Sequence, residues 1–190
     1  IVAAVIVVVA VVTIATAGIG TAVASALGGV AAATIIGGAV GGAITGGITG
    51  AVIGGGYSIV SQGISNGYDN INWSQVGKDF LTGAITGAVT GAALGAVSGA
   101  IKVGQAARMW DKGTFKSGFQ SMKYHYAKHG KQFGSIMNYT DEAVGFGFRN
   151  ASSMTFNASY SGLQNYWTWT CKVGSNGYFT SAGKIITFWI

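Results

Sequence analysis

The sequence has little charge, no proline and a single cysteine, and each shortage excludes a class of protein. Charged residues make up 8% of the 190 residues, against about 25% in an average soluble domain, so disorder driven by charge repulsion is excluded. The absence of proline excludes polyproline and collagen-like segments. Cys171 alone forms neither an internal disulfide nor a zinc ribbon, and its simplest interpretation is a small buried apolar residue.

The charge that is present lies almost entirely in the second half of the chain. Residues 1–68 carry no charged side chain, and residues 1–101 carry one lysine and two aspartates, a net charge of −1. Residues 102–190 carry ten Lys/Arg and three Asp/Glu, a net charge of +7, together with both histidines and four of the five tryptophans. We therefore expect a membrane-active segment over 1–101, a basic connector over 102–118 and a small domain over 119–190. Because the chain begins at Ile1, inside an apolar run, we expect a larger carrier polypeptide to precede it.

Glycines in the first half recur every four residues, in two runs that resemble an internal repeat: 38, 42, 46, 50 and 54, then 83, 87, 91, 95 and 99. This spacing places the glycines along one ridge of a helix, where two helices approach closely, as in GxxxG pairs in membranes. The apolar stretch 1–17 joined to the Gly/Ala stretch that follows it, and the stretch from about 31 to 60, are long enough to span a bilayer. A packed soluble hairpin and a flexible spacer are the alternatives. Asn72 and Gln75 predict a capping box that opens the second glycine helix.

The basic half predicts an α+β domain with helices first and an antiparallel sheet after them. We expect a helix over 119–129 that ends at Gly130, and a short helix over 140–144 with Thr140 as its N-cap. The remaining pattern predicts strands over 146–149, 153–160, 165–173, 178–180 and 184–190, with turns at 174–177 and 181–183. In the last strand Thr187 and Trp189 share one face, and Phe188 lies on the other.

The two histidines of the first predicted helix form the most informative cluster. His125, Lys128 and His129 share one helix face, because residues three and four apart are neighbours. Imidazoles transfer protons near neutral pH, and Lys123, Lys128 and Lys131 stabilise charge on a phosphate. This set fits metal-independent RNA cleavage: a base activates the 2′-OH, which attacks the phosphate, and an acid protonates the leaving oxygen. The net charge of the domain suits an RNA partner. Unpaired bases of that RNA could stack on aromatic side chains, for which the candidates are Tyr124, Tyr126, Trp167, Trp169 and Trp189.

Other interpretations of the same residues remain open. An HxxxH pair is often structural, and the tryptophans fit a core as well as a stacking surface. Zinc binding is conceivable, but the HExxH glutamate of metalloproteases is missing, so we predict no metal and no other cofactor. The basic charge also fits docking on an anionic membrane. The competing functions are thus a membrane-disrupting or membrane-anchored toxin whose basic domain only binds, and a binding module with structural histidines.

The segments KYHYAKHGKQFG (123–134), NYTDEAV (138–144) and GYFTSAGKIITFWI (177–190) resemble the C-terminal toxin domains of bacterial polymorphic toxins of the Rhs and wall-associated type. Many of those domains are small α+β ribonucleases, the grouping of barnase, EndoU, colicin and RelE toxins. The glycine-rich half resembles the pre-toxin segments that precede such domains and are thought to help them enter the target cell.

The resemblance implies an endoribonuclease toxin that most simply cleaves tRNA, released from its carrier and paired with a cognate immunity protein. It implies secretion or cell-surface display by the producer, contact with the bilayer through residues 1–101, and action in the cytoplasm of the target cell. His129 and His125 would be the catalytic pair, Lys128 or Lys123 the phosphate ligand, and Thr187 a polar partner of the scissile phosphate. We add as candidate substrate-binding residues Lys131, Arg149, Tyr178 and Trp189. Residues 147–172 depart from the family pattern, since they form a longer stretch rich in Asn, Ser and Trp.

Overall fold

The computed structural model describes residues 31–160, 163–170, 176–180 and 182–190, and for 156–170 it describes the backbone alone. The chain divides into two compact units, residues 1–100 and 101–190. Each unit is described by itself. The described elements include both helices and an antiparallel sheet, which confirms the predicted α+β class.

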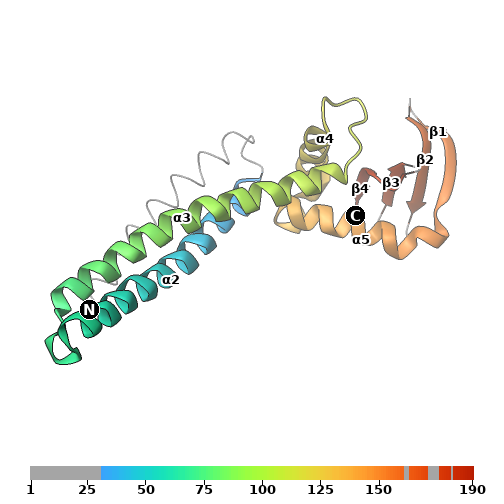
Figure 1. The fold of residues 1–190 in the computed structure, drawn as a ribbon. Coiled ribbons are helices and arrows are strands. Elements are labelled where there is room, and N and C mark those ends of the chain that lie inside the picture. The colour runs from blue at the N-terminus through green and yellow to red at the C-terminus, as the bar shows by residue number, and fades with distance from the viewer. Residues whose placement is uncertain (1–30, 161–162, 171–175, 181) are drawn as a thin grey trace. The chain divides into compact units, whose positions relative to one another are not determined.

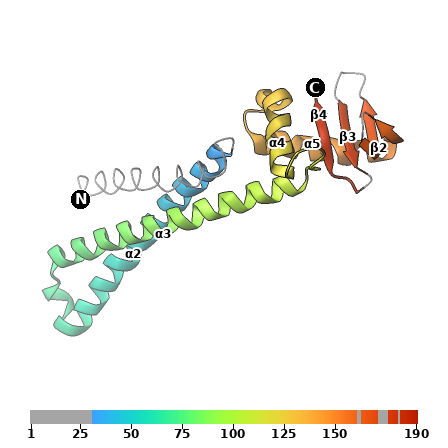
Figure 2. The same ribbon diagram turned by 90° about the horizontal axis from the view of Figure 1, so that it is seen from above.

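The first unit contains two long helices joined by a short polar turn. Helix α2 covers Ala32–Asn66, a 3-10 turn η1 covers Tyr68–Asn70, and α3 covers Trp73–Arg108 and continues into the second unit. Figures 1 and 2 show α2 running antiparallel to α3 along the hairpin. The side chain of Asn72 accepts a hydrogen bond from the Gln75 amide, as predicted for the N-cap. The reciprocal bond is absent, because the Asn72 amide donates to Gln62 Oε1 at 2.7 Å.

The predicted glycine ridges form the contact between α2 and α3. A Cβ placed on Gly42 would collide with the carbonyl of Gly91, and the same holds for Gly46 with Gly87 and for Gly38 with Gly95. Between these contacts lie buried alanines, of which Ala43, Ala88 and Ala92 form one cluster. Only glycine lets the two backbones come this close, so the four-residue period explains the pairing.

The second unit begins within α3 and adds two further helices and a sheet. After α3 come α4 (Gly118–His125), a π-helical turn η2 (Tyr126–Gly130), a 3-10 turn η3 (Lys131–Phe133), α5 (Ile136–Asn150) and a 3-10 turn η4 (Ala151–Ser153). The strands are β1 (Thr155–Tyr160), β2 (Leu163–Thr170), β3 (Asn176–Thr180) and β4 (Ile185–Trp189). They pair antiparallel in the order β1-β2-β3-β4 (Figure 1).

Helix α5 covers one face of the β3–β4 hairpin and forms the core of this unit with it. Its buried side chains are Ile136, Tyr139, Thr140, Ala143 and Phe146. Tyr139 and Phe146 pack against Phe188, with ring centroids 5.9 and 5.0 Å apart. The Tyr139 hydroxyl donates to the Phe188 carbonyl at 2.5 Å. These contacts use the face of β4 that carries Phe188 and leave Thr187 and Trp189 on the other, as the alternation predicted.

Two expectations for the basic half differ from the structure. Residues 102–118 are not merely a connector: α3 runs to Arg108, and Trp110 is 1% exposed in the core. Gly130 does not end the first helix, because the chain continues through η2 and η3 and turns at Gly134, which has φ 77°. Positive φ carries no penalty for glycine, so Gly134 is the residue suited to this turn.

The second predicted helix and two strand or turn segments also differ from the structure. Helix α5 has 15 residues and begins after Ser135, whose side chain accepts from the Asn138 amide. Thr140 lies inside that helix, and residues 146–149 belong to it as well. Asn176 and Gly177, predicted in a turn, belong to β3. The turn before β4 is confirmed at its described residues: Gly183 has φ 77° and its amide donates to Thr180.

Candidate functional site

The two histidines lie four residues apart, where α4 gives way to the π-helical turn η2. Ser117 caps the start of α4 by accepting a hydrogen bond from the Gln120 amide. The helix is regular to His125, and η2 then widens it to π geometry through His129. Side chains four residues apart are neighbours on one face of a helix. The imidazoles lie nearly parallel, 14° apart in plane and 6.3 Å between centroids.

The histidines are the middle members of a row of four rings, which we call the ring stack: Trp110, His125, His129 and Trp189. The indole of Trp110 lies 5.6 Å from the His125 ring at an interplanar angle of 15°. At the other end His129 lies 5.8 Å from Trp189, which belongs to β4. Three separate segments of the chain therefore fix the position of the imidazoles.

Thr187 of β4 ties His125 to the sheet. Its Oγ1 lies 3.0 Å from His125 Nδ1, within hydrogen-bonding distance. With Nδ1 engaged, proton exchange with a ligand falls to Nε2 of that ring. Among the described residues no hydrogen bond is formed by the ring of His129, and both histidines are half-buried.

The surroundings hold both histidines in the neutral form at neutral pH. Burial, followed by the proximity of His129 and Lys128, lowers the pKa of His125 to about 4. Burial and Lys128 also lower the pKa of His129. A neutral imidazole accepts a proton, so both rings are available as bases before a ligand arrives.

The structure gathers some of the predicted site residues and separates others. His125, His129 and Thr187 are in contact, and Lys128 lies 6.0 Å from the Tyr124 ring on the same turn, where it lowers both histidine pKa values. Trp189 joins the ring stack, and Tyr178 meets it edge-on at 5.3 Å. Lys123 lies in α4 and Lys131 lies in η3, and both side chains are exposed.

Arg149 is not brought into this cluster. It lies near the end of α5, where its guanidinium forms an ion pair with Glu142. No contact of its side chain with the ring stack occurs among the described residues, so its predicted role as a substrate ligand loses its geometric basis. The backbones of Trp167 and Trp169 lie in β2, and their side chains fall outside what the structure describes, as does Cys171 altogether.

Sequence reasoning missed Trp110 and Phe115 as parts of the site. The Trp110 Nε1–H donates to Thr140 Oγ1 at 3.1 Å, which fixes the indole against His125. Phe115 meets the same imidazole edge-on at 6.2 Å. The available signal was a tryptophan inside a basic stretch, since a large aromatic residue seldom lies in a solvated connector.

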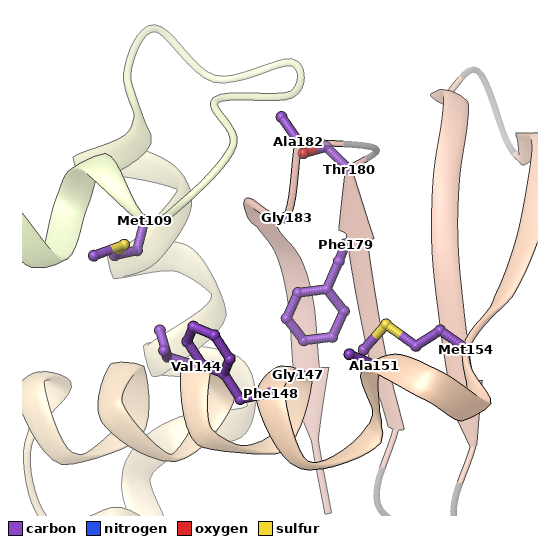
Figure 3. Close-up of a pocket in the computed structure, with 10 residues that line it drawn as sticks. All are labelled: Met109, Val144, Gly147, Phe148, Ala151, Met154, Phe179, Thr180, Ala182 and Gly183. Atoms are coloured by element: carbon purple, nitrogen blue, oxygen red, sulfur yellow. The ribbon is translucent and has the colours of Figure 1, made fainter.

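A cavity of about 430 Å³ is lined by residues outside the ring stack. Figure 3 shows its lining, which includes Val144 and Phe148 of α5 and Phe179 of β3. Met109 lines it as well. Its size falls within the range of small-molecule pockets, but its lining is apolar and lacks titratable side chains. In the described part of the chain no three His, Cys, Asp or Glu side chains cluster as a metal site would need.

The two helices of the first unit also have the length and composition of membrane spans. The most apolar window of α2 is 28% buried, and that of α3 is 22% buried. No protein-family model, no curated protein and no solved structure matches this chain.

Proposed function

We propose that residues 101–190 form an endoribonuclease domain that cleaves RNA without a metal ion, with His125 and His129 as its proton-transfer pair. The observation that carries the proposal is the ring stack, in which two neutral imidazoles lie 6.3 Å apart beside Lys128. In such a reaction each ring nitrogen must come within about 3 Å of the atom whose proton it moves. The sequence resemblance to the polymorphic-toxin ribonucleases implies the same roles for His, Lys and Thr.

In this proposal the negative charge of the substrate phosphate makes one imidazole the acid and leaves the other as the base. Cleavage requires one neutral base and one protonated acid. The phosphate is an anion, and an anion beside an imidazole raises its pKa. The His129 ring forms no hydrogen bond within the described residues, whereas the His125 ring is hydrogen-bonded to Thr187. We therefore assign His129 as the acid. His125, oriented by Thr187, then removes the 2′-OH proton, and the 2′-oxygen attacks phosphorus while the 5′-oxygen leaves with the proton of His129.

The neighbouring residues suit a single-stranded RNA substrate. Lys128 is exposed and has no carboxylate partner among the described residues, so it is free to pair with the phosphate. Trp189 is half-buried and lies against His129, where it offers a stacking surface for the base next to the scissile bond. We extend the proposal to tRNA as substrate and to a cognate immunity protein that blocks this site in the producing cell.

The test is cleavage of RNA by the purified full chain in the presence of EDTA. We expect fragments that end in a 2′,3′-cyclic phosphate when total RNA or tRNA is supplied. His129→Ala and His125→Ala are each expected to lower the rate by at least 100-fold, which is typical for a lost general acid or base. Intact RNA with the native chain, or equal rates for the native chain and His129→Ala, refutes the ribonuclease proposal.

Two matched variants separate catalysis from overall charge and from folding. Lys112→Gln removes one positive charge from the same domain outside the ring stack, and it should leave the rate within a factor of about three. Lys128→Gln removes the same charge from the site and should lower the rate 10-fold or more, with the far-UV circular dichroism unchanged. Equal effects of the two variants would indicate non-specific attraction of RNA rather than a phosphate ligand.

A further inference from the structure

The surface of the α2–α3 hairpin is apolar on the side that faces outward, not only on the side that packs. Exposed aliphatic side chains follow α2 at Val40, Ile44, Ile48 and Val52 and follow α3 at Ile85, Val89, Leu94 and Val97. Ile48 and Leu94, for example, are 64% and 67% exposed. A monomer in water rarely shows so continuous an apolar surface. Only 28% and 22% of the two most apolar windows are buried, whereas the core helix of a soluble protein is mostly buried.

The charge-free part of the hairpin has the length of a bilayer core. In α3 the stretch from Phe80 to Ile101 contains no charged residue, which is about 22 residues or roughly 33 Å of helix. The contacts of Gly54 with Asp79 and of Gly38 with Gly95 place residues 32–53 of α2 beside it. The hydrocarbon core of a bilayer is about 30 Å thick, so both legs of the hairpin match it together.

The turn end of the hairpin has the composition of a membrane–water interface. It carries all the charged side chains of the first unit, which are Asp69, Lys78 and Asp79. Tyr57, Tyr68 and Trp73 are 75%, 63% and 67% exposed at the same end. Tyr and Trp are enriched where a spanning helix meets the headgroups, because each combines an apolar ring with a polar atom.

From these three observations we propose that α2 and the Phe80–Ile101 part of α3 form a hairpin that spans a lipid bilayer, with lipid chains covering its outward face. The turn, residues 66–79, then lies at one surface, and the chain that continues from Ile101 emerges at the opposite surface. Lys102, Arg108, Lys112 and Lys116 follow the span, whereas the turn carries a net charge of −1. The positive-inside rule therefore places the basic end on the cytoplasmic side. This proposal does not depend on the ribonuclease activity.

The topology is tested by the accessibility of single cysteines in the full chain. The background carries Cys171→Ser and His129→Ala, so that RNA cleavage does not complicate expression in bacteria. Cysteine is then placed in the turn (Asn70→Cys), in the middle of the span (Ile48→Cys) or after it (Thr114→Cys). In spheroplasts we expect a membrane-impermeant maleimide to label Asn70→Cys, to label Thr114→Cys only after lysis, and to label Ile48→Cys only in detergent.

A pair of aspartate substitutions separates insertion from adhesion to the surface. Ile48→Asp places a charge on the exposed face in mid-span and is expected to abolish the membrane fraction that resists extraction at alkaline pH. Ser65→Asp places the same charge at the turn end and should leave that fraction unchanged. Labelling of all three cysteines in intact spheroplasts, or recovery of the native chain as a soluble oligomer, overturns the proposal. Labelling of Asn70→Cys and Thr114→Cys on the same side overturns it as well.

Discussion

At the scale of single residues, His125 couples the stability of the second unit to pH. Its pKa is lowered from 6.5 to about 4 in the folded chain, chiefly by burial. Between these values the unfolded chain binds a proton that the folded chain does not, so stability is retained above pH 6.5 and lost as the pH falls toward 4. The full shift corresponds to about 3 kcal/mol, and since part of the ring meets solvent we expect on the order of 2 kcal/mol. Urea unfolding of the native chain and His125→Gln at pH 7 and pH 4.5 measures it, and equal losses in both chains would contradict it.

Lys128 is predicted to set the acidic limb of the pH–rate profile. Its ammonium lowers the pKa of both His125 and His129. A base must be neutral before it accepts a proton, so the rate rises with pH through the pKa of that base. Lys128→Gln should raise the pKa of both rings and move this limb to higher pH, while Lys112→Gln should leave it in place. Rates of RNA cleavage from pH 4 to pH 8 provide the comparison, and an unmoved limb in Lys128→Gln would count against the assignment.

Thr140 is predicted to support the site from within the core. Its Oγ1 accepts from Trp110 Nε1 and donates to the Ile136 carbonyl at 2.9 Å. Thr140→Val leaves the buried indole N–H without a partner, which costs about 1–3 kcal/mol. Thr140→Ser keeps the hydroxyl and should lose no more than about 1 kcal/mol. Chemical unfolding of both variants tests this order, and the reverse order would exclude the hydrogen bond as the cause.

The residue types of the site were readable from the sequence, whereas their packing was not. His125, Lys128, His129, Thr187 and Trp189 could be selected by type and by position along a helix or strand. The π-turn at Tyr126–Gly130 has no strong sequence signal, since the same residues fit an ordinary helix equally well. The contact between Thr187 and His125 spans 62 residues, and only tertiary structure creates it.

At the scale of helices, the two glycines at 41 and 42 should respond oppositely to the same substitution. A methyl group on Gly41 meets nothing within 4 Å, whereas one on Gly42 meets the Gly91 carbonyl. Gly41→Ala should stabilise the hairpin by up to about 1 kcal/mol through helix propensity. Gly42→Ala must separate the helices and should destabilise it by more than that. Thermal unfolding in detergent micelles, followed by circular dichroism at 222 nm, measures both, and a shift in the same direction would contradict the close pairing.

At this scale the regular glycine repeat predicted the structure correctly, whereas local sequence signals within α5 predicted the wrong element bounds. The four-residue glycine repeat predicted the hairpin contact because each glycine has one role, close approach. In α5, by contrast, Thr140 before two acidic residues resembles a helix start, and alternating Phe and Gly at 146–148 resembles a strand. The buried positions Ile136, Tyr139, Thr140 and Ala143 follow the helical period, and burial of that face outweighs both local signals.

At the scale of the whole molecule, the two compact units should unfold in separate transitions. Four of the five tryptophans lie after residue 101, so near-ultraviolet circular dichroism reports mainly the second unit, while the signal at 222 nm includes both. Thr140→Val should shift the near-ultraviolet transition and only the matching part of the 222 nm signal, whereas Gly42→Ala should shift the 222 nm signal and leave the near-ultraviolet transition in place. A single transition that both substitutions move would show one cooperative structure instead.

Because glycine ridges form the contact between α2 and α3, that contact depends little on whether water or lipid surrounds the hairpin. Its contact consists of backbone atoms and methyl groups, from glycine and alanine, which have no side-chain rotamers to restrict. Contacts between Cα–H groups and carbonyl oxygens need no polar side chain as a mediator. The contact between the two helices can therefore stay the same when the hairpin moves from water into lipid. Only the solvation of its outer surface changes.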